Sequence, residues 1–172
     1  MGKSHLIPNY LTALRIILTF PIVILLLLGN YELIAGIIFL IAIFTDYLDG
    51  KIARAYNQVS NLGKFLDPLA DKILVLSILI VLVEKNMISS LIPIIILTRE
   101  FAVSGLRMVL AQKGIVLSAL KEGKVKTALQ NLSLIFYLFK IPAKEYILVL
   151  ALLITIYSGI TYFVKNWKYL SE

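Results

Sequence analysis

Apolar residues in this chain gather into six long runs separated by short polar segments. Only the last run approaches the roughly 20 residues that an α-helix needs to cross a hydrocarbon core of about 30 Å. Each shorter run continues into a helix-compatible segment that carries a few charges. The pattern therefore predicts six membrane-spanning helices, most of them apolar at one end and partly polar at the other. The runs are Ile16–Tyr31, Leu33–Thr45, Ile73–Val83, Asn86–Thr98, Thr127–Phe139 and Tyr146–Val164.

Turn-forming residues mark where these helices are expected to end. Glycine, asparagine and proline favour turns because of their backbone preferences. Such residues stand between successive runs at Gly29-Asn30, Glu84-Lys85-Asn86, Gln112-Lys113-Gly114 and Ile141-Pro142.

The charged helix ends fall on one side of the membrane if six spans alternate in direction. Of the 17 basic residues, only Lys85, Lys140 and Lys144 fall in the opposite loops. Because cytoplasmic loops carry the excess of Lys and Arg, we expect the charged side and both chain ends to be cytoplasmic. Charged half-helices at membrane depth cannot face lipid, so we expect them to enclose a polar cavity open to the cytoplasm.

The overall composition agrees with this topology. The 172 residues are 60% hydrophobic and 16% charged, with a mean hydropathy of +0.93, whereas soluble domains carry about 25% charged residues. We therefore expect an all-α membrane protein with one domain over residues 1–172, placed in the cytoplasmic membrane as a multi-pass protein. The absence of cysteine excludes disulfides and thiolate metal sites. The net charge of +7 concerns membrane orientation and anionic lipid rather than nucleic acid. No signal-peptide pattern precedes the first run, so we expect it to be a retained helix.

All four aspartates of the chain lie in one short segment between the second and third runs. Asp46 and Asp49 are spaced to share one helical face, and Asp67 and Asp71 are spaced to share a face of the next helix. Carboxylates near hydrocarbon are costly and usually functional. Solvation at the membrane interface would explain one such residue, but not four together. Hard oxygen ligands without His or Cys favour Mg²⁺, with Mn²⁺ or Ca²⁺ also possible.

Small and basic residues accompany the aspartates. Gly50 and Ala53 keep their helical face small, which lets a bulky ligand approach the backbone, and Gly63 is suited to a similar close approach. Arg54 supplies a planar fork that fits phosphate oxygens. The segment therefore predicts a site for a divalent metal and a phosphate.

The pattern Asp-x2-Asp-Gly-x2-Ala-Arg-x8-Gly-x3-Asp-x3-Asp resembles the motif of the CDP-alcohol phosphotransferases at every specified position. The resemblance extends to the six-helix layout. It implies transfer of a phosphatidyl or similar group from a CDP-linked donor to an alcohol, with release of CMP. It further implies that Asp46, Asp49, Asp67 and Asp71 hold two ions, Mg²⁺ or Mn²⁺, over the donor pyrophosphate, that Asp71 is the general base, and that the protein is a homodimer. Residues implied to contact the CDP donor are Asp49, Gly50, Ala53, Arg54 and Gly63.

The N-terminal segment has two possible roles. Asn9, Thr12 and Arg15 stand just before the first apolar run. A capped helix start lying along the membrane interface explains them. The segment also resembles the family's N-terminal stretch, where such residues border the nucleotide site.

A second basic cluster lies in the fourth and fifth helices. Positive-inside topology explains lysines in the loop between them, but not Arg99 and Arg107 on one face of the fourth helix. A second substrate that carries a phosphate explains them. The sequence leaves the role of Glu100 open: it pairs with one of these arginines or orients one of them. The residues expected to bind this phosphate are Arg99, Arg107, Lys124, Lys126 and Thr127.

These segments resemble those of family members that use sn-glycerol 3-phosphate as acceptor. The implied reaction takes CDP-diacylglycerol and glycerol 3-phosphate to phosphatidylglycerophosphate and CMP. Inositol phosphate, serine or phosphatidylglycerol as acceptor are alternatives with the same chemistry. A cation channel or transporter is the alternative outside the family, since carboxylates also line ion pathways. A conducting path needs polar groups through the full membrane depth, whereas the outer halves here are nearly all Ile, Leu, Val and Phe.

Overall fold

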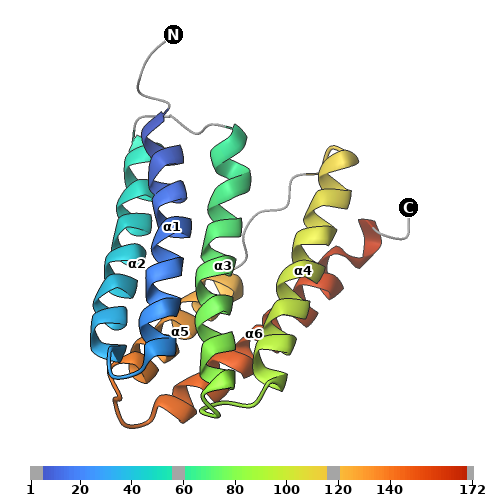
Figure 1. Ribbon diagram of the computed structural model, residues 1–172. Coiled ribbons are helices and arrows are strands. Elements are labelled where there is room, and N and C mark those ends of the chain that lie inside the picture. Colours follow the sequence, from blue (N-terminus) through green and yellow to red (C-terminus); the bar gives the residue numbers. More distant parts are fainter. Residues whose placement is uncertain (1–5, 56–60, 116–120, 170–172) are drawn as a thin grey trace. The chain divides into compact units, whose positions relative to one another are not determined.

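The computed structural model describes residues 6–55, 61–115 and 121–169. For residues 6–11, 48–55, 61–65 and 67 the description covers the backbone but not the side chains. Within these ranges the regular structure is entirely helical, which confirms the predicted all-α class (Figure 1). The helices are α1 (Leu6–Leu28), α2 (Glu32–Ala55), α3 (Asn61–Glu84), α4 (Leu91–Gln112), α5 (Lys121–Leu138) and α6 (Lys144–Asn166), followed by a 3-10 turn η2 (Trp167–Tyr169).

The helices end where the turn residues predicted. Helix α1 ends at Leu28, and both following residues adopt the left-handed region, Gly29 at φ 74° and Asn30 at φ 60°. Glycine enters this region without the steric cost that a Cβ atom imposes, and asparagine tolerates it better than most residues. Asn86 after α3 and Gly114 after α4 also have positive φ, at 54° and 77°.

The charged segments continue the apolar runs as helix. Helix α2 carries the second apolar run and extends through Asp46 and Asp49 to Ala55. Helix α3 begins before Asp67 and Asp71 and continues through the third run. Each aspartate pair therefore lies on one continuous helix, as the spacing predicted.

The chain divides into two compact units, residues 1–85 and 86–172. In the first unit, α1 packs against both α2 and α3, and the three helices run side by side in Figure 1. The core between them is apolar, with Ile22, Leu26, Phe39, Leu74 and Ile78 at most 2% exposed. Glu32 and Lys85 form an ion pair of 3.3 Å that joins the start of α2 to the end of α3.

In the second unit, α6 packs against both α4 and α5. One part of its core is apolar and includes Val103, Leu106, Leu110 and Tyr162. Another part is polar, which is unusual in a chain of this hydropathy. The buried polar side chains of this unit are Glu100, Lys126, Gln130, Ser133, Thr155 and Ser158.

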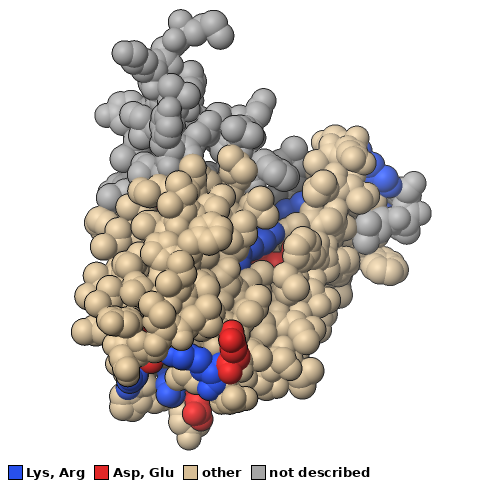
Figure 2. Space-filling view, viewed as in Figure 1, with Lys and Arg blue, Asp and Glu red and all other residues tan. Residues whose placement is uncertain are grey.

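Large apolar side chains cover much of the outer surface. Phe20, Phe44, Leu91, Ile160 and Val164 are each more than 60% exposed, and most of the face seen in Figure 2 is uncharged. Exposed apolar surface on this scale marks a lipid or protein contact. Among the described residues, the stretch Lys144–Tyr169 is long and apolar enough to cross a membrane, and Thr12–Leu28 is a shorter apolar helix.

Candidate active site

A buried arginine joins two of the four aspartates in the first unit. Arg15 on α1 has a side chain that is 2% exposed. Its Nη1 donates a hydrogen bond to Oδ1 of Asp71 on α3 at 2.7 Å, and its Nη2 forms an ion pair with Oδ1 of Asp46 on α2. The two carboxylates are themselves 42% and 43% exposed. The three helices of this unit are thus joined by one cation and two accessible anions.

Chain geometry explains why these three residues meet. Arg15 and Asp46 lie at almost equal sequence distances from the Gly29-Asn30 turn, and successive residues of each helix rise by about 1.5 Å. They therefore reach the same level of the α1–α2 pair. Asp71 lies as far from the end of α3 as Arg15 does from the end of α1, and α1 contacts both neighbours.

The same arrangement tests whether a metal ion fits the carboxylates. Asp46 and Asp71 come from different helices and already converge on one positive group, the Arg15 guanidinium. Their oxygens are the hard ligands that Mg²⁺ and Mn²⁺ prefer. Among the side chains that the structure describes, no group of three or more acidic, His or Cys residues gathers into a metal site. The side chains of Asp49 and Asp67 lie outside those described.

The remaining donor-site predictions divide between described and undescribed side chains. Thr12 is fully buried on α1, one turn before Arg15, so both residues face the interior of the unit. Arg15 was expected beside the nucleotide, and its carboxylate partners were not foreseen from sequence. The position of a lone arginine within an apolar helix could have indicated these contacts, because such a residue needs anionic partners. The side chains of Asn9, Gly50, Ala53, Arg54 and Gly63 lie outside the described residues.

The second unit contains a cluster of two cations around one carboxylate. Arg99 on α4 donates from Nη1 to Oε1 of Glu100 at 3.0 Å. Lys126 on α5 donates from Nζ to the same oxygen. Arg99 also donates from Nη2 to the Ser158 hydroxyl on α6 at 3.0 Å. Glu100 therefore pairs with Arg99, one of the two arginines that the sequence offered.

Arg107 contacts the aromatic side chain of Tyr162 on α6. Its Nε donates to the hydroxyl of Tyr162 at 2.8 Å, and its guanidinium lies 5.1 Å from the centroid of that ring. Tyr162 is 2% exposed, whereas Arg107 is exposed. Both arginines of α4 contact α6, which confirms that they share a helical face.

The other two predicted members of the cluster differ in setting. Lys124 is exposed on α5. The Thr127 hydroxyl donates to the backbone oxygen of Gly123 at 3.2 Å, one turn earlier in the same helix. Lys126 is the member of α5 that is buried at the cluster, at 5% exposed.

Sequence reasoning missed the contribution of α6. The side chains of Thr155, Ser158 and Tyr162 recur at helical spacing in a helix that is otherwise apolar, and all three are buried. The Thr155 hydroxyl accepts a hydrogen bond from Nε2 of Gln130 on α5 at 3.0 Å. This helical spacing of polar side chains could have indicated the contribution of α6, since it marks a helix face that meets polar partners.

The sequence comparisons place the chain among known proteins. The sequence model of the CDP-alcohol phosphatidyltransferase family matches residues 5–157. The chain belongs to the CDP-alcohol phosphatidyltransferase family. This agrees with the resemblance of the aspartate segment, which lies within the matched residues. Family membership also covers Arg99, Glu100 and Lys126, whereas Ser158 and Tyr162 follow the end of the match.

Several relatives within this family are similar over most of their length. A Bacillus subtilis (strain 168) protein is 40% identical over 94% of this chain and 95% of its own length. A Rickettsia felis protein is 38% identical over 95% of this chain and 96% of its own length. A Mycoplasma pneumoniae protein is 34% identical over 81% of this chain and 71% of its own length. All three are named CDP-diacylglycerol–glycerol-3-phosphate 3-phosphatidyltransferase.

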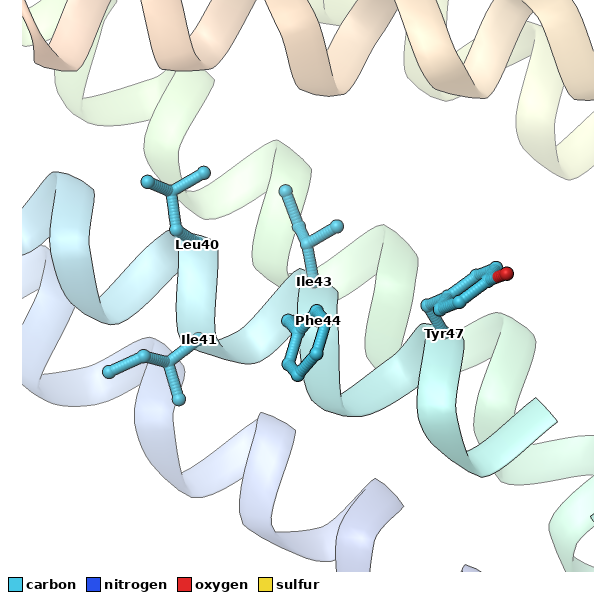
Figure 3. Close-up of a pocket in the computed structure, with 5 residues that line it drawn as sticks. All are labelled: Leu40, Ile41, Ile43, Phe44 and Tyr47. Carbon is cyan, nitrogen blue, oxygen red and sulfur yellow. The ribbon is translucent and has the colours of Figure 1, made fainter. Parts of the chain in front are cut away.

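An open apolar depression of about 610 Å³ lies along α2 of this family member (Figure 3). Its lining side chains come from successive turns of the one helix. Tyr47 at its end follows Asp46 in sequence and is exposed. The lining residues are Leu40, Ile41, Ile43, Phe44 and Tyr47.

Replacing Gly159 with alanine is expected to destabilise the second unit. A Cβ atom at Gly159 would lie 2.9 Å from Cγ of Arg99, so the arginine or α6 must shift. Overpacking of this kind costs about 1–3 kcal/mol. The measurement is thermal unfolding of the purified protein in detergent, where Gly159→Ala should lower the Tm. Gly105→Ala is the matched control, because a Cβ there meets nothing within 4 Å. Equal Tm values for the two variants would contradict the close approach.

Proposed function

We propose that this protein transfers the phosphatidyl group of CDP-diacylglycerol to sn-glycerol 3-phosphate, giving phosphatidylglycerophosphate and CMP. Relatives that bear the name of this activity match almost the entire chain, and the chain covers almost all of their own length. The donor type follows from the family to which the chain belongs.

The observation that carries the choice of acceptor is the buried cationic cluster of the second unit. Arg99 and Lys126 share the single carboxylate of Glu100, so these three side chains hold a net positive charge. Arg107, stacked on the neutral ring of Tyr162, adds a further positive charge on the same helix. A buried excess of cations favours an anionic ligand. This supports an acceptor with a phosphate group over serine, and the names of the relatives favour glycerol 3-phosphate over inositol phosphate.

We assign the acceptor phosphate to Arg99, Arg107 and Lys126, with Lys124 and Thr127 at the edge of the site. The guanidinium groups present planar N–H donors that match phosphate oxygens. Lys124 is exposed on α5 two residues before Lys126 and would add positive charge there. Thr127 lies one residue after Lys126 and contributes a hydroxyl.

The donor is assigned to the aspartate site of the first unit. Asp46, Asp49, Asp67 and Asp71 are proposed to hold two divalent ions, Mg²⁺ or Mn²⁺. When bound, such ions neutralise the charge of the pyrophosphate and of the departing CMP. The convergence of Asp46 and Asp71 on one cation supports this assignment. The proposed donor contacts are Asn9, Thr12, Arg15, Asp49, Gly50, Ala53, Arg54 and Gly63.

Asp71 is proposed to be the general base. An alcohol is a weak nucleophile at neutral pH, so a positioned carboxylate must take its proton as the new bond forms. The acceptor oxygen then bonds to the phosphatidyl phosphorus, the bond from that phosphorus to CMP breaks, and the proton resides on Asp71. The 43% exposure of the Asp71 side chain leaves it accessible to such a hydroxyl.

We further propose that the six helices span the cytoplasmic membrane, enclose a polar cavity open to the cytoplasm, and assemble as a homodimer. The exposed apolar side chains of α1, α2, α4 and α6 support contact with lipid. The exposed apolar side chains of α2 support a path for the donor's acyl chains along this helix. The cytoplasmic orientation rests on the distribution of basic residues along the chain.

The proposal predicts a strict acceptor requirement. Purified protein supplied with CDP-diacylglycerol and Mg²⁺ should release CMP when glycerol 3-phosphate is added, and release should stop when EDTA removes the metal. The measurement is CMP formation by chromatography, with inositol phosphate and serine as parallel acceptors. Release with inositol phosphate instead would refute the acceptor. No release with any acceptor would refute the activity.

A further inference from the structure

We propose that Glu100 is a positioning residue that fixes Arg99 and Lys126 in the orientation that binds the acceptor phosphate. The inference rests on the proposed acceptor site, and it assigns a role to an acidic residue that would not itself touch the substrate. The starting observation is that one oxygen, Oε1 of Glu100, accepts from both cations.

The contacts of Glu100 join two helices. Arg99 is its neighbour on α4, and Lys126 comes from α5, which is separated from α4 in sequence by the loop after Gln112. All three side chains are at least 89% buried, with exposures of 11%, 11% and 7%. Charge-assisted hydrogen bonds in such surroundings are strong and directional. The carboxylate therefore sets the distance between the Arg99 and Lys126 cations.

Arg99 is held on its opposite side by α6. Its Nη2 donates to Ser158 at 3.0 Å, and its aliphatic stem lies against the backbone of Gly159, where a Cβ would approach Cγ to 2.9 Å. The Nε atom is buried without a hydrogen-bond partner among the described residues. These two contacts, one at each end of the Arg99 guanidinium, leave its side chain little rotamer freedom. The conformational entropy of Arg99 is therefore lost when the protein folds rather than when the substrate binds.

A purely electrostatic role for Glu100 makes the opposite prediction. Glu100 lowers the positive charge of the cluster, so its removal by Coulomb's law alone would attract an anionic acceptor more strongly. The KM for glycerol 3-phosphate would then fall. A positioning role predicts that this KM rises, because the two cations repel each other and separate when the shared carboxylate is lost. The sign of the change therefore separates the two roles.

The decisive experiment compares Glu100→Gln and Glu100→Asp with the wild-type protein. Glu100→Gln should raise the KM for glycerol 3-phosphate about tenfold or more, with the KM for CDP-diacylglycerol within about twofold. Glu100→Asp keeps the charge but withdraws the oxygen by one methylene, so an intermediate rise of about threefold is expected. A KM for glycerol 3-phosphate that falls in Glu100→Gln, or that stays unchanged in folded Glu100→Asp, would overturn the inference.

Glu122→Gln is the matched control. Glu122 also pairs with a lysine of the same unit, Lys165, but at 3.4 Å and with that lysine 53% exposed. Exposed pairs of this kind contribute little, so both KM values should stay at wild-type levels. An equal rise in the control would also overturn the inference.

Folding and the acceptor site are tested separately. Removing one partner of a buried ion pair can prevent folding, so thermal unfolding is measured for each variant, and Glu100→Asp alone decides if Glu100→Gln does not fold. Lys126→Ala reports on the acceptor site itself. If it leaves the KM for glycerol 3-phosphate unchanged, the proposed acceptor site is wrong. If it raises that KM while Glu100→Asp does not, only the positioning role is wrong.

Discussion

Replacing Asp71 with asparagine is expected to abolish turnover while most of the donor affinity remains. The amide keeps the size of the side chain but cannot accept the acceptor's proton, and general base catalysis typically contributes about 10²–10⁴-fold. Loss of a metal ligand adds to this, so we expect kcat to fall by about a thousandfold or more. The measurements are CMP release at saturating substrates and equilibrium binding of CDP-diacylglycerol.

Glu32→Gln is the control for this variant. Like Asp71, Glu32 is acidic and belongs to the first unit. It lies at the start of α2 and pairs with Lys85 after the end of α3. Its neutralisation should leave kcat near the wild-type value. Turnover by Asp71→Asn within about tenfold of wild type would show that another group takes the proton. Loss of donor binding together with turnover would show that Asp71 acts mainly through the metal.

Replacing Arg107 with alanine is expected to raise the KM for glycerol 3-phosphate far more than the KM for CDP-diacylglycerol. A hydrogen bond to a charged group contributes about 1.5–3 kcal/mol, which corresponds to about a 10- to 100-fold rise. Arg107 is exposed while its partner Tyr162 is buried, so its removal leaves the core of the unit in place. The measurement is the dependence of the initial rate on each substrate in turn.

Lys144→Ala tests whether any loss of positive charge has this effect. Lys144 belongs to the same unit, at the start of α6, where its Nζ lies 5.2 Å from the centroid of the Tyr137 ring. It is far along α6 from Tyr162, so both KM values should be unchanged. A parallel rise in both KM values of Arg107→Ala would contradict the assignment of the two substrates to separate groups of residues.

Local features of this fold were predictable because local sequence determines them. The turn at Gly29-Asn30 ends α1 through backbone conformations that most residues avoid. The spacing of Asp46 and Asp49 placed both residues on one helix, and the same held for Asp67 and Asp71. These inferences need only the period of a helix and the residue types at its ends.

Contacts between distant segments were harder to predict. The shared carboxylate of Glu100 depends on how α4 and α5 both pack against α6, so the sequence left open whether Glu100 pairs with Arg99 or Arg107. The partner of Arg15 was similarly hidden, since an arginine near an aspartate motif is explained equally well by a phosphate. The role of α6 was missed because Ser158 and Gly159 are small, and small residues in apolar helices commonly serve packing alone.

The Arg15 guanidinium also bears on how the helices of the first unit hold together. Here the chain carries an internal counter-ion between Asp46 and Asp71, supplied by the central helix of the unit. We infer that the packing of these three helices depends on this one buried cation as well as on their apolar core.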